Sequence, residues 1–472
     1  MPPRNESRPL AKPSSYLARL FARPGAVSDH LSGPRLFAAV VLPVASVYLA
    51  TTSWTTAASP DTFLNSLSAY VLAREGTVYL DDYENLRFSL EGMWIVEAPN
   101  GRLVSQYPVA TALHGAVAYL VGGVRTEEKT VVGLDAASVA QRRSLGCPDW
   151  PWPCPAQPDS ELDLEVRRVE LPPIWPAALT AALLTAASMG FLSLAFRELA
   201  SGRAALVAAG VAAFGTSAWS VAADELWQHT VAMFWISLAA WSLSRSRRLP
   251  ALLGHAVAVM VRPLCACVSA GAALVGARRG DWRTVVTALA SALAGAAVVV
   301  SYNAIVLGEP SVSGGYGASF TTRIFDRQPG WFLANFASGL LAPRYGLLVW
   351  SPFIGVLALG GRSAWRAAPD WVRQLAVGGA LYLAAQWALN RASGGALYMY
   401  YRYPLRRSPR LLPSSYSAAC TACETTQPGG DSFGAPPSSP SQPTYSPRSP
   451  ELSTSRPRSS GPSIRTGTFF AP

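Results

Sequence analysis

Charged side chains are scarce in this chain. Of its 472 residues only 14% are Asp, Glu, Lys or Arg, while 50% are hydrophobic; soluble proteins carry about 25% charged residues. Long segments rich in Ala, Val and Leu hold almost no charge, so they lack the polar face that a surface helix of a soluble protein needs. The scarcity argues against an ordinary soluble helical domain and predicts an all-α, polytopic integral membrane protein.

Apolar segments of roughly 17–25 residues are long enough to cross a bilayer as helices, and this pattern predicts about eight to ten transmembrane helices. Residues 250–276 are interrupted by Val-Arg-Pro at 261–263, which predicts two short helices or one broken helix. Residues 108–122 are apolar but short. The clearest spans are 36–53, 173–196, 203–221, 227–243, 284–302, 346–360 and 373–389.

The net charge of +11 is concentrated at the two ends of the chain. Residues 1–35 hold six Arg or Lys and two acids, and the segment from Arg406 onward holds seven Arg and three acids. A nucleic-acid-binding protein clusters its cations on a folded face, whereas these cations flank apolar spans. The distribution argues against a nucleic-acid partner. It predicts a multi-pass protein of the cell (plasma) membrane whose N-terminus is cytoplasmic, because cytoplasmic loops carry the excess of Lys and Arg.

The same rule orients the loops. Residues 54–107 are predicted to form a large first outer loop within a transmembrane domain at 36–404. If 108–122 spans the membrane, the polar loop 123–172 is cytoplasmic; if 108–122 is re-entrant or interfacial, that loop lies outside. The second arrangement keeps the later basic loops on the cytoplasmic side.

Cysteine is also rare, with six in the chain. Cys147 and Cys154 lie in the loop 123–172. Two alternatives remain for them: an extracytoplasmic disulfide, or two unpaired thiols. Residues 405–472 are rich in Ser, Pro and Arg and hold too little apolar surface to fold alone. Two interpretations compete for this tail: a disordered segment, or a frame-shifted end of a longer membrane protein.

Asp61 stands at the start of a helical pattern in "SPDTFLNSLSAYVLAREG" (59–76). Ser59 is suited to the N-cap and Pro60 to the first helical position. An acid in the first turn complements the helix dipole, so Asp61 has a structural interpretation. It also has a catalytic one, because an ionisable residue beside a membrane span is a functional candidate.

Other ionisable residues fall in segments predicted to face outward. Acids and arginines on one face suit the removal of a group from a lipid phosphate. A carboxylate takes the proton from an acceptor hydroxyl, and arginines, or a divalent metal ion held by acids, stabilise the charge on the departing phosphate. Two interpretations remain for His229: a residue at the membrane interface beside Trp227, or a metal ligand. The candidates are Asp224, Glu225, His229, Arg262, Arg344 and Arg402.

Taken in order, these segments resemble the integral-membrane, polyprenyl-phosphate-dependent glycosyltransferases of the GT-C type, which include bacterial protein O-mannosyltransferases and lipid A aminoarabinose transferases. The resemblance covers roughly residues 36–404. The segments that carry it are "SPDTFLNSLSAYVLAREG", "GRLVSQYPVATALHGAVAYLVGG", "GTSAWSVAADELWQHT", "VMVRPL", "SYNAIVLGEPSVSGGYG", "LLAPRYGLLVWSPF" and "ASGGALYMYYRYPL".

The resemblance implies transfer of a sugar from a polyprenyl-phosphate donor to a hydroxyl of a protein, glycan or lipid on the extracytoplasmic face. It places the general base at Asp61, and it assigns Arg262, Arg344, Arg402, Asp224 and Glu225 to the binding of the donor phosphate or of a metal. Two alternatives stay open: a transporter or other non-enzymatic membrane protein, and an inactive truncated member of the family. A transporter is expected to carry paired broken helices in inverted repeats, and the sequence has one such break.

Overall fold

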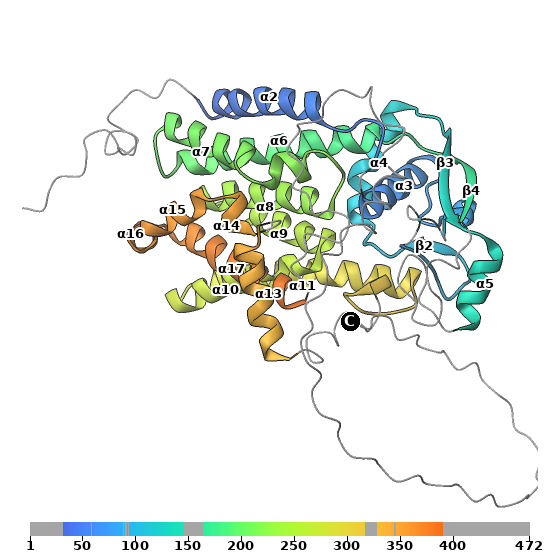
Figure 1. Ribbon diagram of the computed structural model, residues 1–472. Coiled ribbons are helices and arrows are strands. Elements are labelled where there is room, and N and C mark those ends of the chain that lie inside the picture. The colour runs from blue at the N-terminus through green and yellow to red at the C-terminus, as the bar shows by residue number, and fades with distance from the viewer. Residues whose placement is uncertain are drawn as a thin grey trace, which may run out of the picture. The chain divides into compact units, whose positions relative to one another are not determined.

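The computed structural model describes residues 32–57, 59–87, 89, 92, 94–145, 164–316, 328–343 and 346–389. All of them belong to the first of the two units into which the chain divides, Met1–Tyr403. The described chain is mostly helical, which confirms the helical prediction (Figure 1). The predictions for Cys147, Cys154, Arg344, Arg402 and the tail 405–472 concern residues outside the described ones.

Two short antiparallel pairs of strands, which the hydrophobic pattern does not predict, accompany the helices. β1 (Ile95–Glu97) pairs with β2 (Leu103–Ser105), and β3 (Glu127–Leu134) pairs with β4 (Leu164–Leu171). The first pair turns at Gly101, whose φ of 79° favours glycine. Residues 54–107, expected as an outer loop, therefore contain a helix and a hairpin.

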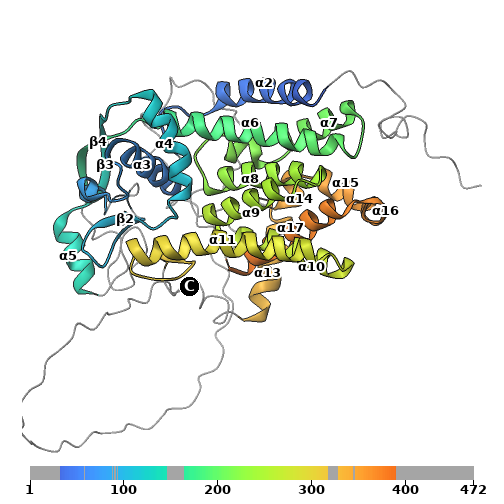
Figure 2. The same ribbon diagram turned by 180° about the vertical axis from the view of Figure 1, so that it is seen from behind.

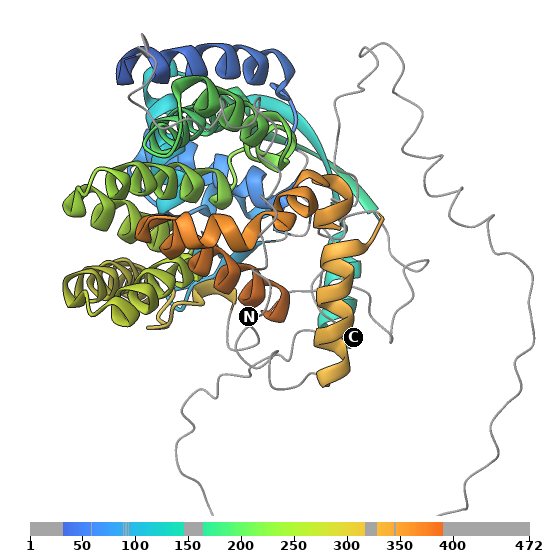
Figure 3. The ribbon, with the colours of Figure 1, turned by 90° about the vertical axis from the view of Figure 1, so that its left-hand side faces the viewer.

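The helices pack as neighbours in a continuous stack. α2 packs on α6, α6 on α8, α8 on α9, and α9 on α11, an order that Figures 1 and 2 show from opposite sides. Figure 3 shows α2, coloured blue, at one edge of this stack. The helices are α2 (Gly33–Thr51), α3 (Pro60–Glu75), α4 (Ala110–Gly122), α5 (Ala136–Ser144), α6 (Trp175–Arg197), α7 (Gly202–Phe214), α8 (Gln228–Ser244), α9 (Arg248–Val261), α10 (Ala266–Arg279), α11 (Trp282–Val306), α13 (Pro329–Leu341), α14 (Leu347–Trp350), α15 (Phe353–Leu359), α16 (Gly361–Ala367) and α17 (Asp370–Leu389). Short segments of other helical types are η1 (Asp81–Leu86), η3 (Ala218–Ala222), η4 (Pro263–Cys265) and η5 (Gly314–Tyr316).

Within the described residues, three helices are long and apolar enough to cross a membrane: α2, α6 and α11. α4, α7 and α9 are apolar but shorter. Two predicted spans differ from the observed helices. The span expected at 203–221 ends as an α-helix at Phe214, because the chain leaves the helix at Gly215 and continues into the π-turn η3. The span expected at 346–360 is divided into α14 and α15 at Ser351 and Pro352, since proline has no N–H to continue the first helix.

The break predicted at 261–263 is confirmed. α9 ends at Val261, Arg262 adopts an extended backbone with φ −146° and ψ 103°, and Pro263 opens the 3₁₀ turn that leads into α10. A residue before proline is pushed out of the helical region by the proline ring. The side chain of Arg262 is therefore carried by a non-helical residue between two helices.

α3 is the most deeply enclosed element near the N-terminus. Ser59 caps it by accepting a hydrogen bond from the Asp61 N–H at 3.0 Å, and Gly76, with φ 66°, ends it. Leu64, Leu67 and Val71 are fully buried in one core cluster. Complete burial of a side chain of this size stabilises the fold by roughly 1.5–3 kcal/mol. The packing of α3 therefore holds the residues at its N-terminus in fixed positions.

Candidate functional site

Asp61 lies in the first turn of α3 and is partly buried. Its Oδ1 accepts a hydrogen bond from the hydroxyl of Tyr107 at 2.6 Å. Burial raises the pKa of the Asp61 carboxyl above its ordinary value, while hydrogen bonds from Tyr107 and Trp94 and the charge of Arg262 oppose that rise. A carboxylate with a raised pKa is a stronger base than a solvated aspartate, and it needs fixed donors to stay ionised.

Tyr107 reaches Asp61 from the end of the first hairpin. Its backbone N–H donates to the hydroxyl of Ser105, the last residue of β2, at 3.1 Å. The Tyr107 side chain is buried. The hairpin therefore determines where the phenol hydroxyl meets α3. Position 107 was not among the predicted site residues, although an aromatic residue before Pro108 at the end of a polar loop was a usable signal.

Arg262 is the cation of the site. Its Nη2 donates to Oε1 of Gln386 at 2.8 Å, and its Nη1 lies 3.2 Å from Nε2 of His229. In the described part of the chain, no carboxylate lies within ion-pair distance of Arg262, and its Nε is buried without a hydrogen-bond partner. A guanidinium that is held by neutral groups keeps its charge available for an anion. The polar residue Gln386 within the apolar helix α17 is the signal that sequence reasoning missed.

The acidic turn after η3 supplies two carboxylates with different contacts. Oδ1 of Asp224 accepts the Ser53 N–H at 2.7 Å and the Thr52 hydroxyl at 3.1 Å, so Asp224 fastens the end of α2. Glu225 is buried and its Oε2 accepts a hydrogen bond from the hydroxyl of Thr62, the residue after Asp61. The structure thus joins Glu225 to the Asp61 turn and gives Asp224 a structural contact.

Hydroxyl groups hold this acidic turn in place. Thr185 and Thr230 both donate to the carbonyl of Ala222, at 3.0 Å and 2.7 Å. Ala222 is the last residue of the π-turn, where the backbone is wider than an α-helix and carbonyls lose their usual partners. The side chain of Asn65 completes the support by donating to the carbonyl of Leu226 at 3.1 Å. The turn is therefore anchored to α3, α6 and α8.

Among the described residues, the donors of this site are not grouped as ligands of a divalent cation. His229 faces the guanidinium of Arg262, whose positive charge would repel a metal ion, and Oδ1 of Asp224 already accepts hydrogen bonds from Ser53 and Thr52. Over the described ranges, no three His, Cys, Asp or Glu side chains come together in a group that could hold a metal ion. Arg262 is therefore the better candidate for stabilising negative charge in this site.

The site thus brings Asp61, Glu225, Arg262 and His229 into one region, with Tyr107 added by the hairpin. No family model, curated protein or solved structure matches this chain.

Proposed function

We propose that this protein is an integral-membrane glycosyltransferase. It transfers a sugar from a polyprenyl-phosphate donor to a hydroxyl acceptor on the extracytoplasmic face of the cell membrane, and its N-terminus is cytoplasmic. The observation that carries the proposal is the presence, in one region, of the partly buried carboxylate of Asp61 and of Arg262, whose charge acts on that carboxylate and whose hydrogen-bond partners are neutral. Such a pair combines a base for an incoming hydroxyl with a charge for a departing phosphate.

The reaction assigns one role to each group. The acceptor oxygen attacks the anomeric carbon of the donor sugar and gives its proton to Asp61. The bond between the anomeric carbon and the phosphate oxygen breaks, and both of its electrons stay on the polyprenyl phosphate. Arg262 stabilises that charge, and Tyr107 keeps the Asp61 carboxylate oriented through its 2.6 Å hydrogen bond.

The apolar surface supports a lipid-linked donor. Along α11 the side chains of Val286, Leu289 and Leu293 are exposed, with exposed fractions between 49% and 69%. An apolar stripe on a helix long enough to cross a membrane is suited to contact with acyl chains or a polyprenyl tail. A hydrophobic donor would then reach the site from within the bilayer.

The test uses the full chain in membrane vesicles with a labelled polyprenyl-phosphate mannose or arabinose and a panel of hydroxyl acceptors. Asp61→Asn removes the base and keeps the shape, so transfer should fall by about 10²–10⁴-fold. Arg262→Gln should slow transfer as well, by loss of charge at the phosphate. Asp82→Asn, an equal charge change at an exposed residue of the same loop, is the matched control and should leave the rate unchanged.

Transfer by Asp61→Asn at the wild-type rate would contradict the assignment of the base. Equal losses in Asp61→Asn and Asp82→Asn would trace the effect to the charge of the loop instead.

A further inference from the structure

One end of the helix stack, at the left in Figure 1, is rich in arginine. Three turns between consecutive helices lie there: residues 198–201 between α6 and α7, residues 245–247 between α8 and α9, and residues 280–281 between α10 and α11. α2 also begins there, because Leu36 near its start shares a buried cluster with Leu194 near the end of α6. Helix ends that are distant in the sequence therefore form one face.

Two ion pairs join these turns across the face. Nη2 of Arg245 lies 2.9 Å from Oε1 of Glu198, which connects the end of α8 to the end of α6. Nη2 of Arg248, at the start of α9, lies 3.8 Å from Oδ2 of Asp281, at the start of α11. Both acids therefore already have an arginine partner.

The start of α17 belongs to the same face. Oδ1 of Asp370 lies 3.2 Å from Nη2 of Arg279, the last residue of α10, and 3.0 Å from Nη1 of Arg373. Arg373 also donates to the carbonyls of Trp365 and Arg366, each at 3.1 Å, and so holds the end of α16 beside α17. α16 thus adds its own side chains to this face.

Five exposed arginines at these helix ends have no carboxylate to neutralise them. Within the described ranges, no ion pair is formed by Arg203, Arg278, Arg283, Arg362 or Arg366. We call these five, together with the four paired arginines, the basic face. Its positive charge exceeds that of its own acids, so the face is suited to an anionic partner.

The surface beside the basic face is apolar. Trp282, next to Arg283, is 67% exposed, and Trp365, next to Arg366, is 45% exposed. The exposed apolar stripe of α11 continues from Trp282, since Val286 stands four positions later on the same side of the helix. Tryptophan side chains are enriched at the headgroup level of a bilayer. Arginines beside them would lie among headgroups, and the stripe would contact acyl chains, whereas a soluble polyanion such as a nucleic acid would gain nothing from the stripe.

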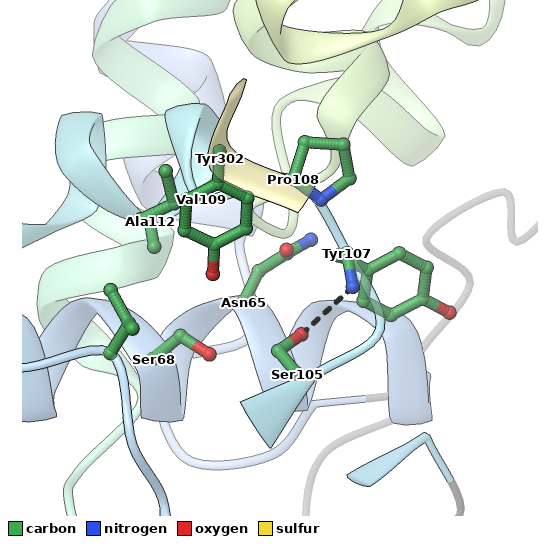
Figure 4. Close-up of a pocket in the computed structure, with 9 residues that line it drawn as sticks. Asn65, Ser68, Ser105, Tyr107, Pro108, Val109, Ala112 and Tyr302 are labelled. Carbon is green, nitrogen blue, oxygen red and sulfur yellow. Dashed lines mark hydrogen bonds between the residues drawn. The ribbon is translucent and has the colours of Figure 1, made fainter. Parts of the chain in front are cut away.

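The basic face is separate from the proposed reaction site. α9 has Arg248 at one end and the break at Arg262 at the other, and its 14 residues span about 20 Å. Near the far end of α11, Tyr302 lines the small cavity drawn in Figure 4, and none of the residues that line this cavity is charged. An anion at the basic face would therefore bind independently of the residues proposed to transfer the sugar.

We propose that the basic face binds anionic phospholipids through their headgroups. Guanidinium groups bind phosphate oxygens in a bidentate geometry. Arg278, Arg283 and Arg366 supply the principal contacts, because they are exposed, carry no ion pair within the described residues and flank Trp282 and Trp365 in the sequence. Phosphatidylglycerol has a net negative charge, whereas the choline of phosphatidylcholine cancels the charge of the same phosphate, so the face selects phosphatidylglycerol.

The test measures the binding of single lipids to the full-length protein in a neutral detergent by native mass spectrometry. Phosphatidylglycerol and phosphatidylcholine with identical acyl chains are compared, so that only the headgroup differs. The wild type should bind phosphatidylglycerol more tightly. In the triple variant Arg278→Gln, Arg283→Gln and Arg366→Gln, affinity for phosphatidylglycerol should fall about fivefold for each arginine removed, while affinity for phosphatidylcholine should change less.

The matched control is the triple variant Arg74→Gln, Arg125→Gln and Arg168→Gln, which removes three exposed arginines from α3, from the segment after α4 and from β4. Arg168 lies 3.7 Å from Glu128, but both side chains of this pair are exposed and it contributes little to stability. Both triple variants should unfold at the wild-type temperature in neutral detergent. The control should bind phosphatidylglycerol with wild-type affinity.

Three results would overturn the proposal: equal affinity of the wild type for the two lipids, equal loss of phosphatidylglycerol affinity in the two triple variants, or an equal loss for both lipids in the first variant. A short single-stranded oligonucleotide tests the competing class of partner. If it displaces phosphatidylglycerol at a concentration below the Kd of the lipid, the partner is a nucleic acid and the lipid assignment fails. None of these variants changes Asp61 or Arg262, so an absence of sugar transfer would leave the lipid result unaffected.

Discussion

Replacing Tyr107 by Phe removes one oxygen atom from the site and keeps the ring that packs beside α3. In the wild type the Tyr107 hydroxyl donates to Oδ1 of Asp61 at 2.6 Å. That bond favours the ionised carboxylate and lowers the pKa of Asp61 against the rise caused by burial. Its removal should therefore raise the pKa of Asp61 further.

The size of the shift follows from the strength of the bond. A hydrogen bond to a charged group contributes about 1.5–3 kcal/mol, and one pKa unit corresponds to about 1.4 kcal/mol. Asp61 is only partly buried, so water replaces some of the lost interaction and the lower end applies. We expect an upward shift of about one unit.

Two readouts measure this shift. In vesicles, the acid limb of the pH profile of kcat/KM should move about one unit to higher pH in Tyr107→Phe, while the plateau at higher pH changes little. Without turnover, the infrared band of the protonated carboxyl, assigned by its loss in Asp61→Asn, should persist to correspondingly higher pH. Tyr79→Phe is the control. An unchanged or downward-shifted pKa in Tyr107→Phe would refute the orienting role of Tyr107.

Two further predictions concern stability, measured as the free energy of unfolding in nanodiscs. Gly378→Ala should destabilise the protein by about 1–3 kcal/mol, because the new Cβ would lie 2.7 Å from Cα of Val268 in α10, whereas the neighbouring Gly379→Ala meets nothing within 4 Å and should be neutral or slightly stabilising; equal effects would refute the close packing of α10 and α17. Glu225→Ala should destabilise by about 0.5–1.5 kcal/mol, since it removes the hydrogen bond from the Thr62 hydroxyl to Oε2 of Glu225 and leaves that hydroxyl the carbonyl of Ser59 as its acceptor, while Glu225→Gln keeps a side-chain acceptor and should retain most of the stability; a greater loss in Gln than in Ala would contradict this reasoning.

The start of α3 shows what local pattern can predict. Ser59, Pro60 and Asp61 act through neighbours in the chain, and the structure has the cap, the first turn and the terminal glycine that the sequence implies. The break at Arg262 is equally local, because the ring of Pro263 constrains the residue directly before it and needs no distant partner to do so.

The contacts of the site are not local, and they were harder to foresee. Tyr107 meets Asp61 across 46 positions and Gln386 meets Arg262 across 124. A periodic pattern of apolar residues does not reveal contacts between residues so far apart in the chain. The split between Asp224 and Glu225 is of the same kind, since two adjacent acids look equivalent in sequence until the fold places one at the end of α2 and the other beside Thr62.

The first hairpin, β1–β2, was missed for a related reason. β1 and β2 are three residues each. A strand is recognised in a sequence by apolar and polar residues that alternate over at least four positions, so these two strands are too short to be recognised. Yet β2 positions Tyr107, and so the part of the fold least visible in the sequence is the part that orients the proposed base.

The most direct test of the central claim is the rate at which label passes from a polyprenyl-phosphate sugar to an acceptor, compared between wild type and Asp61→Asn in the same vesicles. Transfer by Asp61→Asn should be lower than that of the wild type by about 10²–10⁴-fold at equal protein level, with Asp82→Asn unaffected. Transfer by Asp61→Asn at the wild-type rate, or no transfer by the wild type from any polyprenyl-phosphate sugar, would contradict it.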